Sequence, residues 1–477
     1  MSTRARNEGR IVVLGAGLAG LTAAWKLAET FGSRVLLLER EKFTGGMAHT
    51  FSQGDISYDF GSHRIHPSFA PEAMALIREL MGEELLLRER HGRLRLCGRY
   101  MHYPPDLASF LKGLGFTNTL RGGAGFLAAK LRPPIEDGRM LSYEDCMTRR
   151  AGKAIYDLFY SPYAWKVYGI DPKTLSSDAA KTRVSLKKPF AIARDLVLPN
   201  KPEKKFFYYP YRGIGTLAEE LEKRFRGCGG ELLTNASPEV IDMVSNRVRE
   251  VSFRHDGRIS SAGVDTLVSS IPLNGLISVM KPIPSPCVAE SAQALKWRAI
   301  RFLYLRVNRE SCCESETYYY PETRYIFGRI SEPKRFSPYM VRKDGKTVIC
   351  VEVLCGVGDG FWRMEDADLF QYVQNDLKQL GLLRSEKEVS RIFSKRLPAV
   401  YPIYDIPWLD NFRAVQRFLN GVHNLYAIGR GSLFLHDNMD HAIQMGLTLA
   451  KYIASNDGKT DQWTAALAGF RHFEVRD

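Results

Sequence analysis

The hydrophobic pattern at the start of the chain predicts a strand, a helix and a second strand. Four consecutive apolar residues at 11–14 are typical of a strand that is buried on both faces. An amphipathic pattern runs from Leu18 to about Thr30, and residues 34–39 form a second, mostly apolar run. Strands that alternate with helices favour a parallel sheet, so we expect an α/β fold.

Helical periodicity dominates the next part of the chain, between residues 70 and 205. Helices are expected at 71–81, 107–111, 113–131 and 143–159. A stretch rich in Pro and Lys at 198–205 predicts a connecting loop.

Strand patterns return at residue 206 and continue to the C-terminal part of the chain. The predicted strands are 231–234, 239–244, 247–254, 264–270, 299–307, 323–330, 347–355 and 425–428. The predicted helices are 215–225, 366–380 and 439–453. A Pro-rich segment at 397–407 precedes the last strand.

The turn between the first strand and the first helix carries the spacing G-x-G-x-x-G. Gly15 permits a tight turn, Gly17 lets a pyrophosphate approach the backbone, and Gly20 lets the helix pack closely on the strand. Glu39 ends the second strand, where a carboxylate accepts hydrogen bonds from a ribose diol. The predicted dinucleotide-binding residues are Gly15, Gly17, Leu18, Ala19, Gly20 and Glu39.

A pair of glycines six residues after Glu39 points to a flavin dinucleotide. With this pair the sequence resembles the superfamily of flavoproteins with two dinucleotide-binding domains. That superfamily includes amine oxidases, protoporphyrinogen oxidases, phytoene desaturases and UDP-galactopyranose mutases. The resemblance implies FAD as the cofactor, with the chain passing along it at Arg40, Gly45, Gly46 and Met47.

The segment from Tyr58 to Pro67 carries the order Gly-x-His-x-x-His and is most similar to the UDP-galactopyranose mutase branch. The resemblance implies that His63 lies beside the isoalloxazine and is catalytic, whereas His66 supports the loop. Gly61, Ser62, His63 and Arg64 are the cofactor-binding residues that it implies here.

A second match to the same branch lies near the C-terminus. A strand ending in Gly-Arg is followed by Asn-Met-Asp-His, which opens a helix. The resemblance implies cofactor contacts from Gly429, Arg430, Asn438, Met439 and Asp440. Residues 297–302 are similar to the strand that enters the substrate domain, and Arg298 is the second catalytic candidate.

These matches together predict a Rossmann-like FAD-binding domain built from separate segments, a helical cap and a β-rich substrate domain. The FAD-binding segments are 8–67, 206–275 and 412–455. The helical cap is expected at 68–205, the substrate domain at 276–411 and a C-terminal tail at 456–477.

Charge and composition narrow the choice of partners. The 477 residues include 67 basic and 53 acidic side chains, a net charge of +14. Such an excess suits an anionic cofactor, an anionic membrane surface or a plain solvated surface. No basic run or aromatic RNA-binding motif occurs, so we expect no nucleic acid. Apolar residues beside Lys and Arg at 110–116 and 126–132 suit an interfacial helix, but packing on the body is the favoured expectation.

The cysteines and the N-terminus concern metal sites and cellular location. The eight cysteines show no disulfide framework or zinc spacing, so no metal site is predicted. The polar N-terminus has no apolar core of a signal peptide, and we expect a cytoplasmic protein.

Three functions remain open at this point. The first is an FAD-dependent oxidoreductase that transfers a hydride to flavin N5 from a small isoprenoid-, tetrapyrrole- or glycosyl-like substrate. The alternative is a redox-neutral flavoenzyme that isomerises a sugar nucleotide. The third is a flavin-binding scaffold without catalysis.

Overall fold

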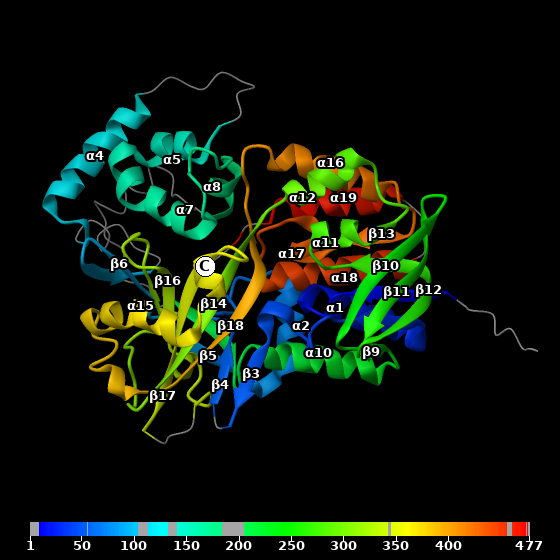
Figure 1. The fold of residues 1–477 in the computed structure, drawn as a ribbon, viewed down its shortest axis with the longest axis horizontal. Coiled ribbons are helices and arrows are strands. Elements are labelled where there is room, and N and C mark those ends of the chain that lie inside the picture. The colour runs from blue at the N-terminus through cyan, green and yellow to red at the C-terminus, as the bar shows by residue number, and fades with distance from the viewer. Residues whose placement is uncertain are drawn as a thin grey trace, which may run out of the picture.

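The computed structural model describes residues 9–54, 56–103, 113–131, 141–183, 205–341, 345–455, 460–473 and 475. The helix predicted at 107–111 and nearly all of the loop predicted at 198–205 lie outside these ranges. The described part contains two large sheets that lie side by side, each covered by helices (Figure 1).

The first sheet has eight strands and a parallel centre. β1 (Arg10–Leu14) pairs in parallel with β2 (Val35–Leu38) and with β12 (Arg258–Ser269). β9 (Glu231–Leu233) extends the parallel part beyond β2, and β19 (Leu425–Ala427) extends it beyond β12. Three segments far apart in sequence therefore form one sheet, which confirms the α/β prediction.

An antiparallel extension continues from the same sheet. β10 (Ala236–Val244) and β11 (Arg247–His255) form a meander with the first half of β12, and β13 (Met280–Lys281) pairs with β10. β12 begins six residues before the predicted start at 264, because its first half pairs with β11 and only its second half pairs with β1.

Helices cover this first sheet and share one apolar core. α1 (Leu18–Phe31) packs against α18 (Met439–Ser455) and α10 (Gly215–Gly227). α2 (Pro71–Met81) and α19 (Thr460–Phe470) contribute buried side chains to the same core. The boundary at residue 68 stays a prediction, although α2 packs with the helices of the first sheet.

The second sheet has seven strands in the order β18-β14-β17-β16-β15-β6-β7. Their bounds are β6 (Arg93–Leu96), β7 (Arg99–His102), β14 (Trp297–Val307), β15 (Thr317–Tyr319), β16 (Phe327–Ser331), β17 (Thr347–Cys355) and β18 (Val389–Pro402). α15 (Asp366–Gln379) packs its apolar side chains on one face of this sheet.

The helical prediction for residues 70–205 is wrong at three strands. β5 (Leu85–Glu89) pairs with β8 (Phe206–Pro210), and β6 and β7 form a hairpin. Cys97 and Gly98 have φ values of 53° and 77° in the hairpin turn. This backbone suits a tight two-residue β-turn, and the alternating Arg and Leu of β6 was the available signal.

The sequence predicts no strand in the Pro-rich segment at 397–407, but β18 extends into this segment and ends at Pro402. β18 lies at the edge of its sheet, and its register shifts between the pairs Arg298–Tyr401 and Ile300–Leu397. Pro398 falls at this irregularity. Proline donates no hydrogen bond and is tolerated at edges and bulges, which explains why the strand persists.

A group of helices lies above the second sheet (Figure 1). It comprises α4 (Phe116–Lys130), α5 (Tyr143–Ala151), α6 (Lys153–Ile155), a π-helical turn at Tyr156–Tyr160, α7 (Ser161–Tyr168) and α8 (Asp178–Arg183). The remaining elements are β3 (Thr50–Gln53), β4 (Ile56–Asp59), α11 (Leu273–Ser278), α12 (Pro286–Ala294), α13 (Pro333–Phe336), α14 (Gly360–Arg363), α16 (Trp408–Asn420) and α17 (Gly429–Leu433).

Candidate active site

A cavity of about 370 Å³ lies where the two sheets meet. Its first wall comes from the glycine turn after β1, the chain after β2 and the start of α18. Its second wall comes from β14, β16, β17 and β18 and from α7. We refer to these as the dinucleotide wall and the sheet wall. Twelve of the predicted site residues line the cavity: Gly17, Leu18, Ala19, Gly45, Met47, Ser62, His63, Arg64, Gly429, Arg430, Asn438 and Met439.

The three glycines of the first turn differ in what surrounds them. Gly15 has φ +92° and donates its N–H to the Leu38 carbonyl at 2.8 Å. A Cβ on Gly20 would lie 1.9 Å from the Gly15 carbonyl oxygen, so this glycine lets α1 approach the turn. A Cβ on Gly17 would meet no atom within 4 Å, and Gly17 lines the cavity. This open space beside the backbone fits the pyrophosphate of a dinucleotide.

The glycine pair after β2 packs directly against this turn. The Gly45 N–H donates to the Ala16 carbonyl at 2.7 Å, and a Cβ on Gly46 would lie 3.3 Å from the Gly17 Cα. Both glycines have positive φ, 94° and 56°. The two glycine motifs therefore form one surface of bare backbone.

Glu39 lies behind this surface and supports it. Its carboxylate accepts the Ala16 N–H at 2.7 Å and the Glu41 N–H at 2.8 Å. Burial raises the pKa of the Glu39 carboxyl above its usual value, and the two backbone donors partly offset this. Arg40 pairs with Glu41 at the exposed surface. Neither Glu39 nor Arg40 lines the cavity, and their cofactor roles stay predictions.

His63 is buried at the boundary of the two walls. Burial, and then the positive charges of Arg329 and Arg430, lower the pKa of the imidazole from 6.5 to about 3. His63 is therefore neutral at physiological pH. Its Nδ1 is buried and has no hydrogen-bond partner within the described residues, so it is available to a bound molecule.

The loop that carries His63 is held by the second sheet. The Ser62 N–H donates to Glu352 Oε1 at 3.2 Å, and a Cβ on Gly61 would lie 2.4 Å from the same oxygen. Arg64 donates to Glu316 at 3.0 Å and to the Tyr319 hydroxyl at 3.2 Å. Gly61 is thus required by a carboxylate of β17, a constraint that the sequence did not show.

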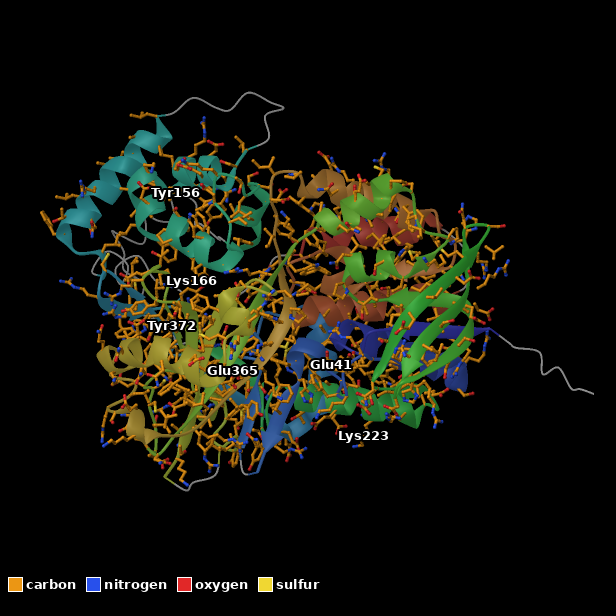
Figure 2. All side chains as sticks on the ribbon, in the orientation of Figure 1. Glu41, Tyr156, Lys166, Lys223, Glu365 and Tyr372 are labelled. Carbon is orange, nitrogen blue, oxygen red and sulfur yellow. The ribbon has the colours of Figure 1, made fainter. Side chains whose placement is uncertain are left out.

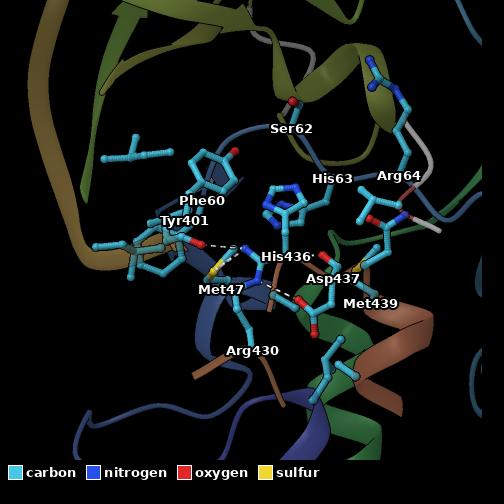
Figure 3. Close-up of a pocket in the computed structure, with 18 of the residues that line it drawn as sticks. Met47, Phe60, Ser62, His63, Arg64, Tyr401, Arg430, His436, Asp437 and Met439 are labelled. Atoms are coloured by element: carbon cyan, nitrogen blue, oxygen red, sulfur yellow. Dashed lines mark hydrogen bonds and ion pairs between the residues drawn. The ribbon is translucent and has the colours of Figure 1, made fainter. Parts of the chain in front are cut away.

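The C-terminal contribution depends on Arg430. Its guanidinium donates to Asp437 Oδ1 at 2.7 Å and to the Val400 carbonyl at 2.9 Å, and contacts the Met47 sulfur at 3.5 Å (Figure 3). These contacts join the loop before α18 to β18 and to Met47 of the dinucleotide wall. Gly429, with φ +75°, lies against Ala19.

Asp440 and Arg298, two further predicted residues, also lie outside the cavity lining. Asp440 is buried and accepts the Ala70 N–H at 3.1 Å, which ties the start of α18 to the start of α2. Arg298 donates to the carbonyls of Leu354 and Lys166 at 3.0 and 3.4 Å. Arg298 does not line the cavity and ties α7 to β17, and its catalytic role stays a prediction.

Sequence reasoning missed the charged residues of the sheet wall. Arg329 donates to Glu352 at 2.8 Å and to the Tyr401 hydroxyl at 3.3 Å, and all three line the cavity. The Glu352 side chain is only 1% exposed. The signal was present, because Glu352 is the one charged residue in the otherwise apolar run of β17.

Lys166 is the second missed group, at the junction of the helical layer and the second sheet (Figure 2). Its ammonium donates to the carbonyls of Tyr320, Glu322 and Phe327. Burial lowers the Lys166 pKa to about 7. Lys166, Arg64, Arg329 and Arg430 bring positive charge to the cavity.

The family comparison agrees with this geometry. A family model described as flavin containing amine oxidoreductase matches residues 18–454. The match covers both walls of the cavity and most of the described elements.

Curated relatives are similar over part of the chain. A lycopene-forming phytoene desaturase of Pseudescherichia vulneris is 27% identical over 271 residues, 52% of this chain and 53% of the relative. Protoporphyrinogen oxidase 1 of Spinacia oleracea is 23% identical over 328 residues, 63% of this chain and 56% of the relative. The chain spans about half the length of the curated relatives it matches.

Solved structures match over nearly the full length. Reduced UDP-galactopyranose mutase superposes with a TM-score of 0.82 and 19% identity, covering 98% of this chain and all of the other. A putative protoporphyrinogen oxidase from Exiguobacterium gives a TM-score of 0.70 with 17% identity, covering 94% of this chain and 99% of the other. At these identities the likeness establishes the fold, as predicted.

Proposed function

Because the chain belongs to the family of flavin-containing amine oxidoreductases, with FAD as its cofactor, we propose that it oxidises a small organic substrate in the cavity. When bound there, FAD supplies the hydride acceptor at N5 for a substrate C–H bond. The residues proposed to hold FAD are those of the dinucleotide wall, with the open space beside Gly17 leaving room for its pyrophosphate.

The observation that carries this proposal is the neutral His63, whose Nδ1 has no hydrogen-bond partner within the described residues, next to apolar side chains of the cavity. Phe60, Ile300, Phe302 and Leu354 line the cavity near the centre of the second sheet. Such side chains exclude water, which protects a hydride in transfer. The His63 ring, by contrast, offers one hydrogen bond to orient the substrate or cofactor without adding a positive charge.

The substrate class is proposed from the mixed character of the cavity. Aromatic and aliphatic side chains accommodate an apolar skeleton, and isoprenoid-like or tetrapyrrole-like molecules fit that description. Arg64 and Arg329 suit a substrate that also carries carboxylate or phosphate groups. The first proposed class is therefore an apolar skeleton with an anionic end.

A second candidate is redox-neutral isomerisation of a sugar nucleotide. It is favoured by the full-length likeness to reduced UDP-galactopyranose mutase and by the same cationic side chains, which suit a diphosphate. In this case the protein would need reduced flavin and would not consume it.

Anaerobic flavin spectroscopy separates these functions. The purified protein should be yellow and release FAD on denaturation. Under the first proposal, a polyene, a porphyrinogen or another apolar donor bleaches the oxidised flavin without added reductant. The second candidate requires conversion of a sugar nucleotide only after reduction by dithionite, with the flavin still reduced at the end. A flavin that responds to neither class under either condition would contradict both and favour a scaffold.

Nothing in the described residues forms a membrane-crossing segment, since no helix there is both long and apolar enough.

A further inference from the structure

α4 directs its large apolar side chains away from the protein. Phe116, Leu120, Leu127 and the adjoining Leu131 are 80%, 57%, 66% and 87% exposed. The spacings of four, seven and four residues place them on one face of a helix. We call these four residues the outer stripe of α4. A helix that packs on a core has the opposite arrangement, so the outer stripe has no apolar cover within the described residues.

The inward face of α4 consists mainly of small residues, with the half-buried Phe126 among them. Gly122 and Ala129 are buried, and a Cβ on Gly122 would lie 2.7 Å from Ile155. Gly125 meets Gly152 in the same way, since a Cβ on Gly152 would lie 2.4 Å from the Gly125 carbonyl carbon. α4 therefore packs on α5 and α6 by close backbone approach. The apolar bulk of its outer stripe contributes nothing to this packing.

The charged residues of α4 itself are all basic. α4 carries Arg121 and Lys130, both exposed, and no acidic residue. The flanking sequence adds the basic Lys112 and Arg132 and, further from the helix, the acidic Asp106, Glu136 and Asp137, and the whole chain has a net charge of +14. Basic groups beside an apolar stripe complement an anionic lipid surface, where each Lys or Arg adds to the attraction.

We propose that α4 docks the protein on an anionic phospholipid bilayer. The helix lies in the plane of the interface, with the outer stripe among the acyl chains and with Arg121 and Lys130 at the headgroups. Its 15 residues span about 22 Å along the axis, too short to cross the hydrocarbon core. Figure 1 shows α4 at the outer edge of the helical layer, away from the first sheet, where no described element covers it.

A second copy of the chain is a poorer occupant of the same face. A symmetric contact between two α4 helices would bring two Arg121 and two Lys130 side chains together with no acidic residue on α4 to neutralise them. Like charges held close together oppose such a contact. This inference is independent of the proposed function, because it uses no residue of the cavity.

The test is flotation of the full-length, FAD-loaded protein with vesicles. We expect binding to vesicles of 70% phosphatidylcholine and 30% phosphatidylglycerol at 50 mM NaCl, and much weaker binding to pure phosphatidylcholine. Leu120→Gln/Leu127→Gln should reduce the partition coefficient at least tenfold. Arg121→Gln/Lys130→Gln should reduce it by about 10–30-fold on anionic vesicles only.

The matched control is Val244→Gln/Ile259→Gln, which removes two apolar side chains that are 51% and 58% exposed on the first sheet. This variant should bind vesicles as the wild type does. Absence of binding at 50 mM NaCl, or equal loss in the control, would overturn the proposal. A different result would assign the outer stripe to a second copy of the chain. In that case the wild type does not bind vesicles but forms a concentration-dependent dimer in vesicle-free buffer, and Leu120→Gln/Leu127→Gln abolishes the dimer. FAD content and circular dichroism identify any variant that has misfolded.

Discussion

On the dinucleotide wall of the cavity, Gly17, Gly45 and Gly46 present bare backbone, whereas on the sheet wall Arg329 and Glu352 present paired charges. The first wall works by the absence of side chains, because an added Cβ at Gly17 enters only empty space. The second wall works by their presence, because each charge is held by a partner from another strand.

The comparison teaches that substitutions on the two walls have different effects on ligand binding and on stability. A substitution at Gly17 leaves the protein intact and excludes the ligand, because an added side chain meets no protein atom there. A substitution on the sheet wall leaves a charge without its partner inside the protein, so stability falls together with activity.

Gly17→Val should have the largest effect on the cofactor. Its added methyl groups occupy the space proposed for the pyrophosphate and meet no protein atom at Cβ, so we expect a folded protein without FAD. The measurement is the FAD:protein ratio with circular dichroism. Gly20→Val is the contrast: its Cβ would lie 1.9 Å from the Gly15 carbonyl oxygen, so it should destabilise the fold itself. Normal FAD content in a folded Gly17→Val variant would remove the loop from the cofactor site.

His63→Ala tests the boundary between the walls. We expect most FAD to be retained and turnover to fall by about 10²–10⁴-fold, the span for a positioned polar group. His66→Ala should be milder, because His66 Nδ1 accepts hydrogen bonds from the Ser68 N–H at 3.1 Å and from its hydroxyl at 2.7 Å within the loop. Turnover and FAD occupancy are measured once a substrate is found; until then the flavin midpoint potential is the proxy. Unchanged turnover and potential in His63→Ala would make this histidine structural.

Glu352→Leu tests the sheet wall. It leaves Arg329 without its carboxylate, and we expect a loss of about 3 kcal/mol in the free energy of unfolding. This value is at the low end for buried pairs because the Arg329 side chain is 25% exposed. The double variant Arg329→Met/Glu352→Leu should recover more than half of that loss and remain inactive. Denaturant titration gives both values; a double variant less stable than Glu352→Leu would show that the charge pair is not the cause.

Glu39→Ala should weaken FAD binding without unfolding the protein. It removes the acceptor of the Ala16 and Glu41 N–H groups and the proposed partner of the ribose. Hydrogen bonds to charged groups are worth about 1.5–3 kcal/mol, so Kd should rise by about 10–150-fold. Fluorescence titration of the apoprotein with FAD measures this, and an unchanged Kd would place the ribose partner elsewhere.

The smallest expected effect is the pH dependence that His63 contributes. In the folded protein the His63 pKa is about 3, whereas the ordinary value is 6.5, so between these values the unfolded chain binds a proton that the native state does not. This contribution to stability is present above pH 6.5 and is lost as the pH falls toward 3. Between pH 7 and pH 5 the wild type should lose about 2 kcal/mol more than His63→Gln. Parallel curves for the two proteins would mean that His63 is protonated in the fold.

Much of the dinucleotide wall could be predicted from the sequence because its chemistry is local. The spacing of Gly15, Gly17 and Gly20 after an apolar run specifies a strand, a turn and a helix within ten residues, and the resemblance extended this to FAD. The family match confirms the flavoprotein prediction, and the folded sheet joins the expected segments. The roles of individual site residues stay predictions, as do the domain boundaries.

The sheet wall could not be predicted because its residues acquire their role from distant partners. Glu352, Arg329 and Tyr401 lie on three strands, and no local spacing connects them. The contacts of Arg298 could not be predicted for the same reason, since only the packing of α7 on the second sheet brings its guanidinium to backbone carbonyls.

The sequence by itself therefore determined the fold class, the cofactor family and the bare-backbone surface, all of which depend on residue types at short, fixed spacings. Only the tertiary structure decided which charges face the cavity and that the apolar side chains of α4 point outward. The physical reason is that the burial and pairing of a side chain depend on its neighbours. For Glu352 and Leu127, elements far away in the chain determine whether such neighbours are present.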